Sequence, residues 1–109
     1  MSENHILCKT EEQIMMFATK IRMQPYCDFS NDPTEIAEIY IIGCPKPGYY
    51  AKAVLYDYLM KYPGSICVGT APFPVLIPER SLRGEKYVRS TPNATTNDNL
   101  LSLPREYSW

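Results

Sequence analysis

The distribution of proline is the feature that most restricts how this 109-residue chain can fold. Pro72, Pro74 and Pro78 stand within seven residues of one another. Because proline has no backbone N–H to donate, such a stretch cannot lie in the centre of a sheet. We therefore expect residues 70–78, "TAPFPVLIP", to form an edge strand or an extended segment.

Two segments between the prolines have apolar residues at helical spacing. Thr10 and Gln13 form a capping-box pattern, and the apolar residues that follow predict a helix over residues 11–23. A second helix is predicted over residues 50–61, ended by the Tyr62-Pro63-Gly64 sequence. Its buried stripe is expected to be Ala51, Val54, Leu55, Tyr58 and Leu59, with Lys52, Tyr56 and Asp57 on other faces.

Three further runs are typical of strands. Residues 35–42, 65–69 and 86–90 are short, rich in apolar or β-branched side chains, and bounded by Gly, Pro or Ser. The chain is therefore expected to be one α+β domain spanning residues 1–109. It should hold a small, mostly antiparallel sheet with one long helix packed on one face and an additional N-terminal helix.

Charge and hydropathy exclude several classes of partner. The formal net charge is −1, which gives no reason to expect nucleic acid or a membrane surface as a partner. There is no apolar run long enough to span a bilayer, and the N-terminus is too polar for a signal peptide. A cytoplasmic location is expected, with Cys8, Cys27, Cys44 and Cys67 as reduced, small apolar side chains.

The residues that usually carry catalysis are sparse. The single histidine, His5, lies near the start of the chain, so neither a metal site nor a cysteine–histidine pair is expected. The chain has no glycine-rich phosphate loop and no serine-hydrolase or zinc-protease motif. We therefore expect a protein without enzymatic activity and without a cofactor, and a weak hydrolase is the remaining catalytic alternative.

Arginine is concentrated in the C-terminal part. Between residues 80 and 92, four cations stand against Glu85 alone, a local excess of +3. Strand alternation places Tyr87 and Arg89 on one face of residues 86–90, where a ring and a guanidinium would project together. Such a pair suits a base or ribose beside a phosphate.

A polar loop follows that strand. Its side chains can both donate and accept hydrogen bonds, as sugar hydroxyls and phosphate oxygens require: Ser90, Thr91, Asn93, Thr95, Thr96, Asn97 and Asn99. Leu100, Leu101 and Leu103 are expected to hold the segment on the core. Alternatively, the loop satisfies only its own hydrogen bonds, and Arg89 pairs with Glu85 or caps a helix.

The motif "YVRSTPN…NDNLLSLP", from Tyr87 to Pro104, resembles the C-terminal signature of a family of small bacterial and phage domains of unknown function. The matching residues are Tyr87, Val88, Arg89, Ser90, Pro92, Asn93, Asn99, Leu100, Leu103 and Pro104. Asn93 stands where that pattern often has aspartate.

In size, α+β make-up and lack of a catalytic centre, the chain also resembles phage anti-Thoeris proteins of the Tad type. This resemblance implies a non-enzymatic sponge that sequesters cyclic ADP-ribose immune signals and works as an oligomer with pockets at subunit interfaces. It also implies that the helix over residues 50–61 forms the dimer contact and that residues 89–99 close over the ligand.

We therefore expect a sponge that binds a cyclic nucleotide or cyclic ADP-ribose signal in the host cytoplasm and blocks defence. The expected ligand-binding residues are Arg89, Tyr87, Thr91, Asn93, Thr95, Asn97, Asn99, Arg83, Arg105 and Phe73. Arginines would neutralise phosphate, Tyr87 or Phe73 would stack on the base, and the asparagines would bind ribose. The alternative is a protein-interaction module that docks a partner through the tyrosine-rich helix and the proline-bracketed edge strand.

Overall fold

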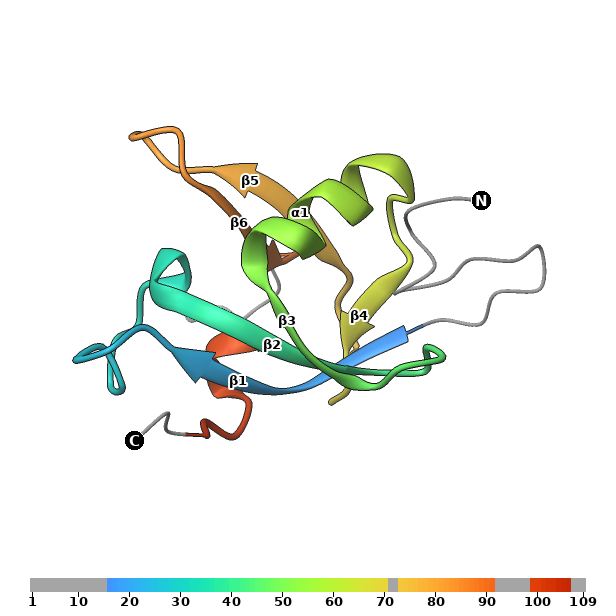
Figure 1. The fold of residues 1–109 in the computed structure, drawn as a ribbon, viewed down its shortest axis with the longest axis horizontal. Helices are drawn as coiled ribbons and strands as arrows, with labels where there is room; N and C mark the ends of the chain where they lie inside the picture. Colours follow the sequence, from blue (N-terminus) through green and yellow to red (C-terminus); the bar gives the residue numbers. More distant parts are fainter. Residues whose placement is uncertain (1–15, 71–72, 92–98, 107–109) are drawn as a thin grey trace.

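The structure is a computed structural model that describes residues 16–70, 73–91 and 99–106, and it confirms the α+β class (Figure 1). The described part holds one α-helix, α1, and six strands, with two short 3₁₀ helices. In chain order the elements are β1 Met16–Met23, η2 Pro33–Glu35, β2 Ile36–Ile42, β3 Gly48–Ala51, α1 Lys52–Lys61, β4 Ile66–Val68, β5 Leu76–Arg80, β6 Lys86–Ser90 and η3 Asn99–Ser102.

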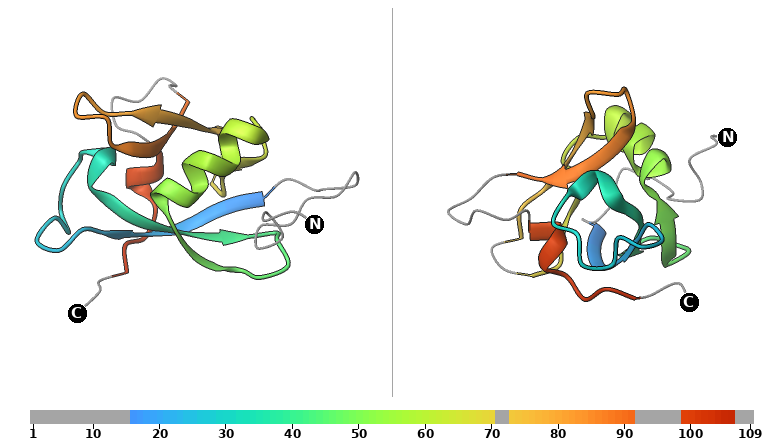
Figure 2. Two further views of the ribbon diagram at one scale, coloured as in Figure 1. Left: turned by 45° about the horizontal axis from the view of Figure 1, so that its top comes forward. Right: turned by 90° about the vertical axis from the view of Figure 1, so that its left-hand side faces the viewer.

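The strands form two sheets. The larger has the order β3-β2-β1-β4, in which β4 runs parallel to β1 and the other neighbours are antiparallel. β5 and β6 form a separate antiparallel hairpin. Figures 1 and 2 show α1 and this hairpin on the same side of the larger sheet. β4 pairs only with the first part of β1, Met16 to Ala18. Further along β1, Ile21 forms a parallel bridge with Arg105.

The predicted N-terminal helix is wrong over residues 16–23, which form β1; residues 11–15 and the capping box lie outside the described residues. The pairing of β1 with β2 shifts register between Ala18 and Lys20. Such a bulge moves the inward-facing side chains from one parity to the other. Met16 and Ala18 are buried before it, and Ile21 and Met23 after it. The resulting apolar spacing imitates a helical stripe.

The second helix begins two residues later than predicted. Tyr50 and Ala51 belong to β3, where Tyr50 pairs with Ile39, and α1 starts at Lys52. Its end at Lys61 agrees with the prediction, because the sequence Tyr62-Pro63-Gly64 follows and proline cannot continue the helix.

The buried faces of α1 are wider than the predicted stripe. Leu55, Tyr58 and Leu59 are buried as expected, whereas Ala51 and Val54 are exposed. Lys52 and Tyr56, which were expected on other faces, are buried. The reason is that α1 packs against the hairpin as well as against the larger sheet, so a second side of the helix is covered. The Arg80 Nε of β5, for instance, donates to the Tyr56 hydroxyl at 3.2 Å.

The strands predicted over residues 35–42, 65–69 and 86–90 are confirmed as β2, β4 and β6. Of the proline-rich segment 70–78, only residues 76–78 lie in a strand, β5, which continues to Arg80 and tolerates Pro78 opposite Val88. The core gathers apolar side chains from both sheets, α1 and η3, including Leu100, Leu101 and Leu103, which anchor the C-terminal segment as predicted.

Cys27, Cys44 and Cys67 are free thiols that pack in or against the core. Among the described residues, no helix is long and apolar enough to cross a membrane.

Alternating cations and aromatic rings cover the face of the larger sheet that carries Tyr40 and Tyr49. The Lys20 Nζ lies 4.7 Å from the Tyr40 ring centroid, and the Arg22 guanidinium lies 4.1 Å from the Tyr49 centroid. The Tyr49 hydroxyl donates to the Glu106 carboxylate. Burial and this hydrogen bond raise the pKa of Tyr49 to about 12 from an ordinary value of 10.

This shift predicts a loss of stability in alkali. A raised phenol pKa contributes stability that is fully present below the unfolded pKa of 10 and is lost as the pH rises through about 12. Between pH 10 and 12, the free energy of unfolding measured with denaturant should therefore fall more for the wild type than for Tyr49→Phe. Tyr26→Phe, at a residue 97% exposed, is the control and should follow the wild type. Equal pH profiles for Tyr49→Phe and the wild type would contradict the assignment.

Candidate functional site

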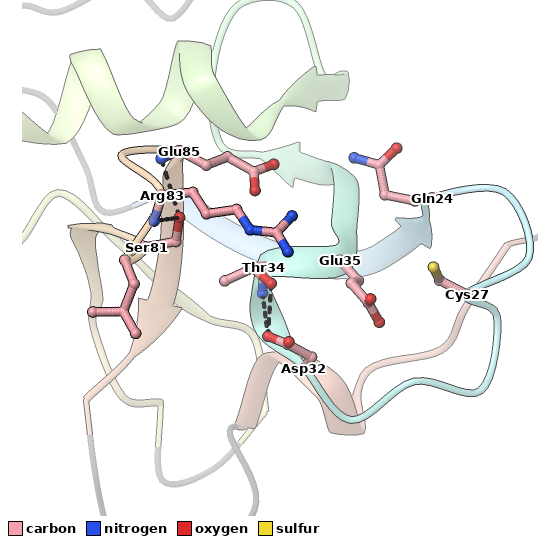
Figure 3. A pocket seen from close by; sticks show the side chains of 9 residues that line it. Gln24, Cys27, Asp32, Thr34, Glu35, Ser81, Arg83 and Glu85 are labelled. Carbon is pink, nitrogen blue, oxygen red and sulfur yellow. Dashed lines mark hydrogen bonds between the residues drawn. The ribbon is translucent and has the colours of Figure 1, made fainter.

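A pocket of about 500 Å³ lies between the segment that joins β1 to β2 and the turn that joins β5 to β6 (Figure 3). Nine residues from these two segments line it: Gln24, Cys27, Asp32, Thr34, Glu35, Ser81, Leu82, Arg83 and Glu85. Its volume lies in the range of small-molecule sites.

The hairpin wall of the pocket is braced by its own hydrogen bonds. The Ser81 hydroxyl accepts from the backbone N–H groups of Arg83 and Glu85, at 3.2 and 3.1 Å. The Gly84 N–H donates to the Ser81 carbonyl, and Gly84 adopts a φ of 85° that favours glycine. The turn therefore holds its shape without a ligand.

The opposite wall is built around η2. The Asp32 carboxylate caps this helix by accepting from the Thr34 N–H at 2.9 Å and from the Thr34 hydroxyl at 2.8 Å. These bonds hold the pKa of Asp32 below its ordinary value, so the group is ionised at neutral pH. The Gln24 N–H donates to the Glu35 carbonyl at 2.8 Å and ties the end of β1 to the same wall.

Lys52 joins the two walls. Its ammonium donates both to the Thr34 carbonyl of η2 and to the Glu85 carboxylate of the hairpin. The residue is 8% exposed although it carries a charge. A cation in this position fixes the separation of the walls, because it is hydrogen-bonded to one and ion-paired with the other.

Arg83 is the cationic side chain that points into the pocket. Figure 3 shows its guanidinium extending from the hairpin turn across the space, with Glu85 on one side and Thr34 and Glu35 on the other. Among the residues that the structure describes, this guanidinium has no ion-pair or hydrogen-bond partner. It is thus available to an anionic ligand as a planar two-donor fork.

Carboxylates outnumber cations in the lining. Asp32, Glu35 and Glu85 stand against Arg83. Burial and the neighbouring Glu35 carboxylate raise the pKa of the Cys27 thiol, so this thiol is protonated at neutral pH. The arrangement can bind one anionic group at Arg83 and hydroxyl or amine donors at the carboxylates.

Tyr87 and Arg89 project together from β6, as strand alternation predicted. Both contact Glu79 on β5: the Tyr87 hydroxyl at 3.3 Å and the Arg89 Nη2 at 3.4 Å. Arg89 does not pair with Glu85, which is bound to Lys52. Burial and Glu79 raise the pKa of Tyr87, and the Asp32 charge adds to this effect, so the cluster lies within electrostatic reach of the pocket.

Of the other expected ligand contacts, Phe73 and Thr91 are not part of the pocket lining. Phe73 packs edge-on against Phe17 at the start of β1, with ring centroids 6.3 Å apart, whereas the pocket adjoins the end of β1. The Thr91 N–H donates to the Val75 carbonyl at 2.9 Å. Asn93, Thr95, Asn97 and the side chain of Asn99 lie outside the described residues.

Arg105 stabilises the segment that leads into the η2 wall of the pocket. Its Nη1 donates to the Asp28 carbonyl at 2.6 Å, and its Nη2 donates to the Leu101 carbonyl at 3.0 Å. The guanidinium therefore ties the segment before η2 to η3.

Replacing Arg105 by alanine should loosen that segment, because two charge-assisted hydrogen bonds to carbonyls are lost. We expect a loss of about 1–3 kcal/mol in the free energy of unfolding and faster amide exchange over residues 26–32. Arg105→Lys keeps the charge but cannot bridge two carbonyls with a planar fork. Its free energy of unfolding should therefore lie between those of the alanine variant and the wild type. An alanine variant with wild-type exchange at these amides would show that Arg105 does not hold the wall.

Most of the pocket-lining residues were not predicted from the sequence. A signal existed for the η2 wall, since Asp32-Pro33-Thr34-Glu35 combines a capping side chain with proline in the first turn. Glu85 and Lys52 had no such signal, because their pairing joins the hairpin to α1. Among the described residues, no cluster of three or more histidine, cysteine or acidic side chains is placed to hold a metal ion.

A family model described as "Protein of unknown function (DUF3892)" matches residues 67–104, from β4 through η3. This match includes the Tyr87–Pro104 motif and the hairpin wall of the pocket, and it leaves the η2 wall outside. The resemblance to a family of small domains of unknown function is therefore confirmed for this part of the chain. No curated protein and no solved structure matches the chain.

Proposed function

We propose that this protein is a non-enzymatic binding protein that sequesters a small phosphorylated nucleotide, cyclic in form, in the pocket between η2 and the hairpin turn. In this role it acts as a sponge of the kind that the Tad-type resemblance implies, with a cyclic nucleotide or cyclic ADP-ribose signal as cargo. Arg83 binds the phosphate, and the acidic wall accepts hydrogen bonds from ribose hydroxyls.

The observation that carries the proposal is the Arg83 guanidinium. A charged, planar fork that extends into a pocket and has no partner among the described side chains favours a planar or tetrahedral anion as its partner. The carboxylates around it suit the rest of a nucleoside, because acidic side chains commonly accept hydrogen bonds from ribose hydroxyls.

The rigidity of the walls supports tight capture. Ser81 braces the hairpin turn, Asp32 caps η2, and Lys52 connects the two. A preformed pocket avoids the loss of affinity that ordering a loop on binding would bring. Tyr87 and Arg89 extend the surface beside Asp32, where a larger ligand would reach them, and Arg89 would first have to release Glu79.

A homo-oligomer remains part of the proposal, with a revised contact. Tyr56 and Tyr58 are buried within the protein's own core, so they are not available as a dimer surface. On α1, Val54 and Met60 are 45% and 61% exposed and would form the apolar part of that contact.

The second candidate function is a protein-interaction module. Tyr26, Phe29 and Leu82 are large apolar residues that lie on the two segments bordering the pocket, and they are 97%, 84% and 108% exposed. Phe73 in the proline-rich segment is 52% exposed. Exposed aromatic and aliphatic side chains of this kind favour contact with a partner chain.

The test is capture and release. The purified protein is incubated with a mixed pool of cyclic and linear nucleotides, washed and heat-denatured, and the released compounds are identified by mass spectrometry. We expect one cyclic species to be released intact. A chemically altered species would indicate a hydrolase, and an empty protein would favour the interaction module.

A further inference from the structure

We infer that the pocket discriminates by the charge of the ligand's phosphate and accepts the singly charged diester of a cyclic nucleotide while rejecting a doubly charged terminal phosphate. The inference rests on the proposed function and adds to it a rule that separates an intact cyclic signal from its opened, linear form.

The charge of the pocket is fixed by contacts that do not involve a ligand. Asp32 is held in its ionised form by the two hydrogen bonds from Thr34, which depress its pKa. Glu85 is compensated by Lys52. Three carboxylates therefore stand against the two cations Arg83 and Lys52, which leaves one net negative charge around the site.

The two forms of a nucleotide phosphate differ by about one charge. A cyclic phosphodiester carries one negative charge, whereas a terminal monoester carries about 1.5 to 2 at neutral pH because its second pKa is about 6. One guanidinium neutralises the diester fully. The extra charge of the monoester would lie among carboxylates without a second unpaired cation, because Lys52 is already paired with Glu85, and like charges at this range oppose binding.

Glu35 determines this selectivity. Unlike Glu85, the Glu35 carboxylate has no ion-pair partner among the described residues. Figure 3 places it across the pocket from the hairpin turn that carries Arg83. Its charge therefore acts on a bound phosphate without compensation, and glutamine at this position would remove the charge while keeping the shape.

The experiment compares two probes, adenosine 3′,5′-cyclic monophosphate and adenosine 5′-monophosphate, by calorimetry at low salt and neutral pH. The wild type should bind the cyclic probe about tenfold more tightly. In Glu35→Gln the affinity for the monoester should rise about tenfold and that for the cyclic probe much less. Asp57→Asn on the outside of α1, where Asp57 pairs with Lys86, is the control and should keep the wild-type ratio.

The outcomes separate this inference from the function on which it rests. If both probes bind and Arg83→Ala weakens both, but Glu35→Gln leaves their ratio unchanged, the site stands and the charge rule is wrong. If neither probe binds, or if binding ignores Arg83, the proposed site fails and the charge rule fails with it. If the ratio of the two affinities becomes smaller in Glu35→Gln but not in Asp57→Asn, the result supports both the proposed site and the charge rule.

Discussion

Replacing Leu100 by alanine is expected to lower the free energy of unfolding by about 2–5 kcal/mol, because it leaves a cavity where η3 enters the core. Leu100 is fully buried in the first turn of η3. For a domain whose total stability is about 5–15 kcal/mol, this is a large fraction. Thermal unfolding should show a fall of about 8 °C or more in the transition midpoint.

Leu82→Ala is the matched control for this change. It removes the same atoms from a leucine that is 108% exposed on the hairpin turn, so the free energy of unfolding should stay within about 0.5 kcal/mol of the wild type. If Leu100→Ala were as stable as Leu82→Ala, the C-terminal segment would not be part of the core.

Replacing Arg83 by alanine should weaken binding of the captured nucleotide by about 10- to 150-fold, the value of one charge-assisted hydrogen-bonded contact of about 1.5–3 kcal/mol. The thermal transition should not move, because the Arg83 side chain is exposed and has no partner among the described residues. Arg83→Lys keeps the charge without the fork and should fall between alanine and the wild type.

Arg89→Ala distinguishes the two arginines. Arg89 is paired with Glu79, so we expect a smaller loss of affinity than for Arg83→Ala. Calorimetry on both variants measures the affinity for the captured nucleotide and shows which arginine contributes more to binding. If Arg89→Ala abolished binding and Arg83→Ala did not, the ligand would lie along the outer face of β6 and not in the pocket.

The elements with simple local patterns could be predicted from the sequence. β6 was predicted with its observed bounds, since Lys86–Ser90 alternates and is enclosed by turn residues. The edge position of β5 was predicted from Pro72, Pro74 and Pro78, of which Pro78 lies in the strand itself. β1 could not be predicted, because its bulge replaces strand alternation with spacing that a helix also produces. The burial of Lys52 depends on Glu85 and Thr34, which are distant in the sequence.

The candidate site was predicted in part. Arg83 belongs to both the predicted ligand-binding set and the pocket lining. Arg105 belongs to the predicted set, but its guanidinium is bound to the carbonyls of Asp28 and Leu101. Composition identified the arginine-rich region, but only the tertiary structure shows which guanidinium is engaged and which is available.

The bridge between Ile21 and Arg105 has a consequence for the timing of folding during synthesis. These partners are 84 residues apart (105 − 21), so at 5–20 residues per second the ribosome needs roughly 4 to 17 s to add the second after the first. Once β2 has paired with β1, and until Arg105 is added, the end of β1 presents an unpaired edge of the kind that associates with other chains. Arg105 covers this stretch of the edge only after nearly the whole chain has been synthesised.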